Sequence, residues 1–211
     1  MLSDQALPEQ RMILSNISWA TYERLLADHE NSSAPRFTYD RGMLEIMSPN
    51  PEHEVANRRI AQLVLIFAEE MGIVVQDFGS TTFRREDLER GFEPDSCFYI
   101  QNEERVRNKN RLDLTVDPPP DLVIEIDISS PSLDKLAIYA RLGVPEVWIY
   151  DGERLKIRNL DENAGYAEVR ESTILSGLTA ETLTRFVQRG ATLDWLAWVR
   201  EVRGWARNLR T

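Results

Sequence analysis

The sequence predicts an α/β fold in which a mixed central sheet lies between two helices. A helix-periodic apolar pattern is followed by three short apolar strands, and a second helix then leads to one more strand. The crossover through the second helix makes its flanking strands parallel, so the sheet is mixed. At 211 residues and 42% apolar content, the chain 1–211 can bury a full core as a single domain.

The first core helix begins at Pro51 and is expected to end at Gly72. Its apolar positions follow helical spacing: Ala56, Ile60, Leu63, Val64, Phe67 and Met71. The second helix is expected over about 132–142, after the break at Ser129-Ser130-Pro131, with Gly143 as its stop.

Short apolar runs bounded by charged or turn-forming residues predict the strands. The core strands are expected over 73–78, 94–100, 122–128 and 145–150, and two further strands over 155–160 and 166–169 extend the edge. The core of the domain therefore covers about 51–150.

Accessory elements are expected at both ends, over 17–50 and 151–205. Ser18 can cap a helix, and strands over 36–39 and 43–47 form a hairpin around Asp40-Arg41-Gly42. From Thr192 onward the pattern predicts an amphipathic helix, whose apolar stripe either packs on its own domain or forms a dimer contact. The stripe consists of Trp195, Trp198, Val199 and Val202.

Composition limits the classes of function. The formal charge is −10, from 25 basic and 35 acidic residues, which is the wrong sign for non-specific coating of nucleic acid. Two segments, 105–111 and 200–210, are nevertheless locally basic and are read either as phosphate contacts or as a solvated loop and tail. Cys97 is the single cysteine and is expected to be buried, so disulfides and Cys/His zinc sites are excluded.

The N-terminal sequence has no cationic start followed by an apolar stretch. The longest apolar run, 61–68, is far too short to cross a bilayer. A cytoplasmic protein with no membrane partner is therefore predicted.

Alternating residues in the segment 121–128 place carboxylates where a core strand is expected. Glu125 and Asp127 share one face with Val123, and the other face carries only Leu and Ile. In a sheet open to water this would be ordinary alternation. In a strand covered on both sides the two acids would repel one another, and a hard divalent cation such as Mg²⁺ or Mn²⁺ would compensate.

Other charged residues are candidates for the same site. Asp95 follows Pro94 at the start of the preceding strand and could meet Glu125 across adjacent strands, although a turn-forming role is the usual one. Lys135, early in the second helix, can point back at the acidic strand or be an ordinary surface lysine. On the first helix, Glu54 suits the N-terminal dipole and His53 is expected to be exposed.

The arrangement resembles the PD-(D/E)XK phosphodiesterases, which have a restriction-endonuclease-like core. The stretches MLEIMSPNPEHE, EPDSCFYI and PPPDLVIEIDISSPSLDKLAIYARLGVPEVWIYD are similar to a large bacterial family described as putative restriction endonucleases. The similarity runs from about residue 17 to 191, which is most of the chain.

This resemblance implies a set of site residues. It implies that Asp95 and Glu125 hold Mg²⁺ or Mn²⁺, that the main-chain carbonyl of Ile126 adds a ligand, and that Glu54 approaches the site. The superfamily pattern expects lysine two residues after Glu125, where this sequence has Asp127. Members of the family place a lysine on the following helix, and Lys135 occupies the matching position.

The function predicted from the resemblance is metal-dependent phosphodiester hydrolysis of nucleic acid, with DNA favoured over RNA. In that reaction Lys135 would orient water or neutralise phosphate charge. The alternative is a catalytically inactive nuclease-like module that binds nucleic acid or a protein partner. A homodimer is expected, because many nucleases that cut duplexes use two sites.

Overall fold

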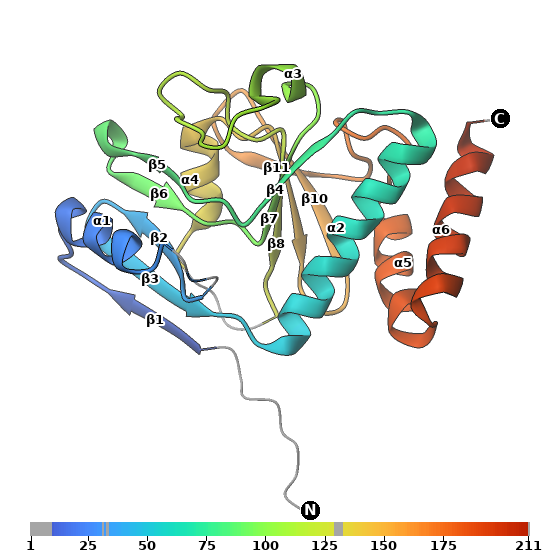
Figure 1. The fold of residues 1–211 in the computed structure, drawn as a ribbon, viewed down its shortest axis with the longest axis horizontal. Helices are drawn as coiled ribbons and strands as arrows, with labels where there is room; N and C mark the ends of the chain where they lie inside the picture. The colour runs from blue at the N-terminus through green and yellow to red at the C-terminus, as the bar shows by residue number, and fades with distance from the viewer. Residues whose placement is uncertain (1–9, 31, 33, 129–132, 211) are drawn as a thin grey trace, which may run out of the picture.

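Two β-sheets and the helices between and beside them form the computed structural model, which describes residues 10–30, 32, 34–128 and 133–210 (Figure 1). The central sheet has the order β11-β10-β9-β8-β7-β4, and the second, accessory sheet has the order β1-β3-β2-β6-β5. The strands of the central sheet are β4 (Gln76–Gly79), β7 (Ser96–Tyr99), β8 (Leu122–Ile126), β9 (Glu146–Tyr150), β10 (Leu155–Leu160) and β11 (Tyr166–Val169). Those of the accessory sheet are β1 (Gln10–Leu14), β2 (Arg36–Asp40), β3 (Met43–Ser48), β5 (Phe83–Arg85) and β6 (Arg90–Phe92).

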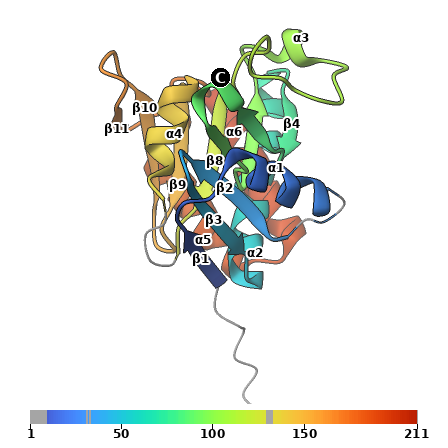
Figure 2. The same ribbon diagram turned by 90° about the vertical axis from the view of Figure 1, so that its left-hand side faces the viewer.

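Helices lie beside both sheets. They are α1 (Trp19–Asp28), α2 (Pro51–Met71), α3 (Glu103–Val106), α4 (Lys135–Leu142), α5 (Ala180–Thr192) and α6 (Trp195–Leu209). In Figure 1, α2, α5 and α6 stand on one side of the central sheet, and α4 lies on the side that faces the accessory sheet. Figure 2 shows the accessory strands in front of the rest of the chain.

The mixed character of the central sheet is confirmed. Strand β8 pairs antiparallel with β7 and parallel with β9, and α4 makes the crossover between β8 and β9. The observed α/β fold is therefore a mixed central sheet between helices, with an added helix-hairpin at its N-terminal side and an added C-terminal helix.

The alternation in β8 sorts its apolar side chains between two cores. Leu122, Ile124 and Ile126 belong to the cluster formed with α2, α5 and α6. Val123 belongs to the cluster that also holds Cys97 and residues of α4, β5 and β6. Strand β8 ends at Ile126 and not at residue 128. Asp127 still donates its backbone N–H to the carbonyl of Tyr150, but it is exposed, so the expectation of two buried acids on this strand is wrong for Asp127.

The ends of the two core helices follow from their capping residues. The side chain of Asn50 accepts a hydrogen bond from His53 N at the start of α2, and Gly72 ends that helix with φ 71°. Asp134 caps α4 by accepting from Ala137 N, and Gly143 ends it with φ 79°. The predicted start of α4 at Ser132 lies outside the described residues.

Several short elements differ from the sequence prediction. Strand β4 begins at Gln76 and not at 73, and β7 begins at Ser96 and not at 94. Strands β1, β5 and β6 and helix α5 are additional elements. β5 and β6 are three residues long and carry Arg84, Arg85 and Arg90, so their apolar signal is too weak to predict a strand.

The C-terminal helix packs on its own chain. Trp198, Val199 and Val202 are buried, whereas Trp195 at the start of the helix is 62% exposed. An ion pair at 2.7 Å between Arg203 and Glu70 joins α6 to α2. Among the described residues, no helix has both the length and the apolar character that a membrane span requires.

Candidate active site

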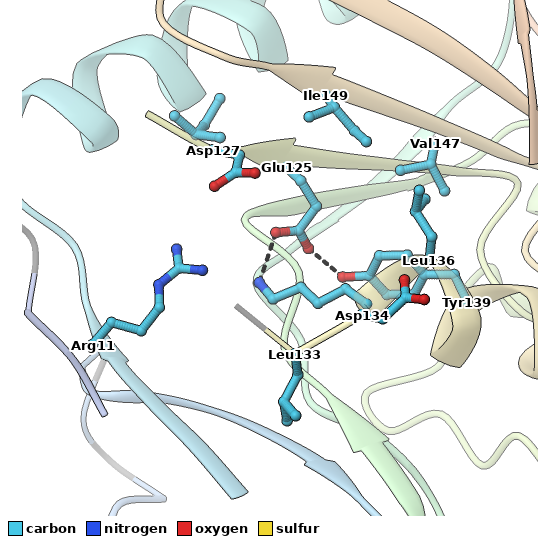
Figure 3. A pocket seen from close by; sticks show the side chains of 11 residues that line it. Arg11, Glu125, Asp127, Leu133, Asp134, Leu136, Tyr139, Val147 and Ile149 are labelled. Atoms are coloured by element: carbon cyan, nitrogen blue, oxygen red, sulfur yellow. Dashed lines mark hydrogen bonds and ion pairs between the residues drawn. The ribbon is translucent and has the colours of Figure 1, made fainter. Parts of the chain in front are cut away.

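Glu125 lies at the centre of the candidate site. It belongs to strand β8, is 6% exposed, and faces the first turns of α4. Its Oε2 lies 2.7 Å from Lys135 Nζ, and its Oε1 accepts a hydrogen bond from the Tyr139 hydroxyl (Figure 3). Lys135 and Tyr139 are four residues apart on the helix, so the fold brings both onto the face that meets Glu125.

A cavity of about 300 Å³ opens beside Glu125. In Figure 3, Glu125 and Tyr139 stand on one side of this cavity, and Arg11 of β1 reaches toward them from another side. The cavity is lined by Arg11, Glu125, Ile126, Asp127, Leu133, Asp134, Lys135, Leu136, Tyr139, Val147 and Ile149. Glu125, Ile126 and Lys135 of the predicted site residues therefore meet at one cavity, whereas Asp95 and Glu54 are not part of its wall.

Asp95 lies in the short link that crosses from the accessory sheet to the central sheet. The link is Glu93-Pro94-Asp95, between β6 and β7. Asp95 is 2% exposed, and its Oδ2 accepts a hydrogen bond of 2.7 Å from the main-chain N of Ile126. Since Ser96 pairs with Ile124 in antiparallel register, the next residues outward on the two chains are Asp95 and Glu125.

His53 is a site residue that the sequence prediction missed. It was expected to be exposed at the start of α2, but it is fully buried, and its Nε2 lies 3.2 Å from Asp95 Oδ2. One turn further along α2, Asn57 donates to the main-chain carbonyl of Asp95 at 2.9 Å. The N-terminal half of α2 packs over the link through these contacts, which explains the burial of His53.

Arg36, at the start of β2, is the second missed residue. Its Nη1 donates to Asp95 Oδ1, and its Nη2 lies 3.5 Å from Glu54 Oε2. Glu54 also pairs with the exposed Arg58 at 2.7 Å, and Arg36 links it to Asp95. No motif in the sequence marked Arg36, although an arginine beside Phe37 at the start of a predicted strand is an available signal.

Two further acids lie near the site with raised pKa values. Glu45 of β3 is 1% exposed, accepts from Leu133 N at 3.1 Å, and lies 3.8 Å from Arg11. Burial raises the pKa of Glu45, and the positive charges of Lys135 and Arg11 oppose that shift. Burial likewise raises the pKa of Glu93, against its hydrogen bonds from Thr82 and Phe37 N. Both groups therefore favour the neutral form more than a solvated glutamate does.

Most of the arginine and lysine residues in the two locally basic segments are paired with acids. Arg107 contacts Glu103 and Lys109 contacts Asp117, and Arg111 lies 3.1 Å from Glu30. In the C-terminal tail, Arg203 and Arg207 bind Glu70. Of the two readings of these basic segments, the pairing with acids favours a solvated loop and a packed helix over contacts to phosphate.

The acids of the site do not form a ready-made cage for a metal ion. Among the residues that the structure describes, no three Asp, Glu, His or Cys side chains come together closely enough to hold one. The positive charge next to the two buried carboxylates comes instead from Arg36 at Asp95 and from Lys135 at Glu125.

The candidate site therefore combines a buried acid and a lysine beside a cavity, on a mixed α/β sheet. The model of the Uma2 family, described as "Putative restriction endonuclease", matches residues 19–195. The chain therefore belongs to this family, as its motifs predict, and membership supports a nuclease-type function. Strand β1, with Arg11, precedes the matched region.

One solved structure is similar over most of its length. It is described as a putative nuclease belonging to DUF820 from Anabaena variabilis, with 15% identity and a TM-score of 0.49. The alignment covers 72% of this chain and 92% of that one. No curated protein matches the chain.

Proposed function

We propose that the chain is a metal-dependent nuclease that hydrolyses phosphodiester bonds in nucleic acid, with DNA preferred to RNA. The observation that supports this most directly is the buried Glu125 on a central strand, 2.7 Å from the Lys135 ammonium and beside a cavity of about 300 Å³. A carboxylate paired with an ammonium in a sheltered cavity can order a water molecule and stabilise negative charge on a phosphate.

Asp95 and Glu125 are the proposed metal ligands, with the main-chain carbonyl of Ile126 as a third. An ionised carboxylate offers about four lone-pair positions, and Glu125 uses two of them for Lys135 and Tyr139. Hard oxygen donors of this kind fit Mg²⁺ or Mn²⁺, and Mg²⁺ commonly uses one or two carboxylates together with water and substrate phosphate. When bound, such an ion supplies charge stabilisation to the phosphate oxygens and makes a nearby water more acidic.

The remaining roles belong to side chains of the site. Lys135, held in place by Glu125, is proposed to orient the attacking water or to donate to a phosphate oxygen. The Tyr139 hydroxyl fixes the Glu125 carboxylate, and burial raises the pKa of Tyr139 well above its usual value, so the hydroxyl remains a donor. Glu54 is proposed to act at the edge of the site, through its contact with Arg36.

Cleavage of plasmid DNA and of RNA in the presence of Mg²⁺ or Mn²⁺ tests the proposal. The wild-type protein is expected to cut DNA, and Asp95→Asn and Glu125→Gln are expected to remove the activity. Glu201→Ala is a suitable control, because Glu201 pairs with Arg189 on the surface formed by α5 and α6. Cutting that persists in both site variants would contradict the assignment of the site.

The alternative function is a nuclease-like module without activity, which binds nucleic acid or a protein partner. The pairing of both buried carboxylates with basic side chains of the chain itself favours this alternative. Salt-dependent binding of DNA without any cleavage, under conditions where Mn²⁺ binding depends on Glu125, would support it over hydrolysis.

A homodimer is proposed as the assembly. Trp195 and Leu196, at the start of α6, are 62% and 50% exposed and offer apolar area outside the packed stripe. Light scattering is expected to give twice the mass of the chain, and a monomer at tens of micromolar, roughly the upper range of cellular concentrations, would contradict it. The cytoplasmic location stays a prediction.

A further inference from the structure

Two acids of the candidate site, the proposed metal ligand Asp95 and its neighbour Glu54, already share one cation from the chain itself, the guanidinium of Arg36. Arg36 belongs to the accessory sheet, and its side chain is 8% exposed. One of its terminal nitrogens bonds to Asp95 Oδ1, and the other lies 3.5 Å from Glu54 Oε2. It therefore bridges the link before β7 and the start of helix α2 through two different carboxylates.

The charges around Arg36 explain why a buried guanidinium is stable there. Burial lowers the pKa of Arg36, and the negative charges of Glu125, Glu54 and Glu93 oppose this shift. A cation surrounded by several acids in a sheltered site is the arrangement that a divalent ion would otherwise provide.

The oxygens of Asp95 leave limited room for a second cation. Oδ2 accepts from Ile126 N and faces His53 Nε2 at 3.2 Å. Oδ1 accepts from Arg36. A divalent ion at Oδ1 would lie next to the guanidinium, and two positive charges at that separation repel each other strongly in a sheltered site.

Arg36 also has space in which to move. It lines a polar cleft of about 480 Å³, between α1 and the segment 110–112, together with Glu23, Glu30 and Glu93. A rotation of the side chain toward this cleft would exchange its contact with Asp95 for water and for these acids.

We infer that Arg36 is a positioning residue that holds Asp95 and Glu54 in place in the metal-free protein and competes with the divalent ion for Asp95 Oδ1. The inference rests on the proposed metal site and concerns how the ion gains access to it. Metal binding then requires the guanidinium to leave Asp95, so the affinity of the wild-type protein for Mn²⁺ is lower than the carboxylates alone would give.

The test uses wild-type protein and Arg36→Met without nucleic acid. Calorimetric titration with Mn²⁺ measures the affinity for the ion, and thermal unfolding with and without Mn²⁺ measures the melting temperature. Arg36→Met is expected to melt at a lower temperature than wild type without metal, because Asp95 loses its counter-charge. It is expected to bind Mn²⁺ at least tenfold more tightly, and its melting temperature should therefore rise more on addition of Mn²⁺. A purely structural ion pair would lower the melting temperature but leave the Mn²⁺ affinity unchanged.

Arg90→Met is the matched control. Arg90 belongs to the same accessory sheet, is 12% exposed, and pairs with Asp40 at 3.0 Å, away from the candidate site. It should destabilise the protein without changing the Mn²⁺ affinity. In Arg36→Met combined with Asp95→Asn, the gain in affinity should disappear.

Arg36→Lys covers the case in which Arg36→Met does not fold. Lysine keeps the positive charge, but its single ammonium group replaces the two terminal nitrogens of the guanidinium. The Mn²⁺ affinity of Arg36→Lys should therefore lie between those of wild type and Arg36→Met. Equal Mn²⁺ affinity in wild type and in the Arg36 variants, or an equal gain in Arg90→Met, would overturn the inference. That result would not affect the proposed hydrolysis of nucleic acid. Conversely, if the variants bind Mn²⁺ as inferred but the wild-type protein never cuts nucleic acid, only the proposed activity is contradicted.

Discussion

Lys135 Nζ lies 2.7 Å from Glu125 Oε2, and the two side chains are 11% and 8% exposed. Removal of one partner from such a sheltered pair typically costs about 3–5 kcal/mol. Lys135→Met is therefore expected to lower the free energy of unfolding by an amount near the low end of that range, because Tyr139 still donates to Glu125. Cleavage should fall by about 100-fold or more if Lys135 acts on water or phosphate.

Lys156→Met is the control for this prediction, since Lys156 pairs with Asp151 at 2.9 Å and is more exposed, at 25%. It should retain full cleavage. A Lys135→Met protein that cuts as fast as wild type would exclude a catalytic role for the lysine.

The Tyr139 hydroxyl is expected to contribute more to stability than a hydroxyl bonded to a neutral acceptor. Tyr139→Phe keeps the edge-to-face contact with Phe92, at 4.8 Å between ring centroids, and loses only the donor to Glu125. The expected loss is about 1.5–3 kcal/mol, as for hydrogen bonds to charged groups. Tyr166→Phe removes a hydroxyl that donates to the carbonyl of Val144, and its loss should be about 1 kcal/mol. Urea denaturation of both variants measures the difference, and equal losses would contradict it.

Glu45 should make the stability of the protein fall as pH rises. Burial raises the pKa of Glu45 above its usual value of 4.5, so the folded state binds its proton more tightly than the unfolded state does. The stabilisation is complete below pH 4.5 and is lost as pH rises through the raised pKa. Glu45→Gln removes this dependence, so its stability relative to wild type should increase between pH 4 and pH 8, roughly the range over which a raised carboxyl pKa is titrated.

Glu201→Gln provides a comparison of the opposite sign. The Arg189 side chain lowers the pKa of Glu201, so that pair contributes stability at neutral pH that is lost as pH falls. Thermal unfolding at several pH values should therefore show the two variants diverging in opposite directions. A Glu45→Gln curve parallel to that of wild type would contradict the prediction.

Glu146 is expected to stabilise the fold without taking part in the site. It is fully buried in β9 and accepts from Trp148 Nε1, Ser172 Oγ and Thr173 N, at 2.6, 2.6 and 2.8 Å. Glu146→Ala leaves these donors without their acceptor and should cost on the order of 3 kcal/mol. Hydrogen exchange should increase in the segment that follows β11, while Mn²⁺ affinity stays unchanged. A change in Mn²⁺ affinity would contradict the separation of Glu146 from the site.

Sequence patterns predicted the elements whose signals are local. The α2 helix, with Pro51 at its start and Gly72 at its end, and the parallel pair β8–β9 around α4 follow from periodicity and capping. The contact between Lys135 and Glu125 is also where the motif places it. Arg36 and His53 escaped prediction because their proximity to Asp95 depends on how the accessory sheet and α2 pack against the link, and no residue spacing encodes that packing.

The same reason explains the missed short strands. β5 pairs with β6, and β6 pairs with β2, through a register that only the complete accessory sheet defines. The three-residue sequences FRR and RGF carry no period that would distinguish a strand from a loop. Asp127, in contrast, was placed in the strand by extending an alternation that stops at Ile126.

The tripeptide Glu93-Pro94-Asp95 joins the accessory sheet to the central one, and its two acids accept hydrogen bonds from strands of the two sheets. Glu93 anchors Phe37 N of β2, while Asp95 binds Ile126 N of β8. Local opening of the accessory sheet is therefore expected to displace Asp95. The candidate site would then be lost before the central sheet unfolds. Mutations in the accessory sheet, far from the cavity, are thus expected to abolish the proposed activity while the central sheet stays folded.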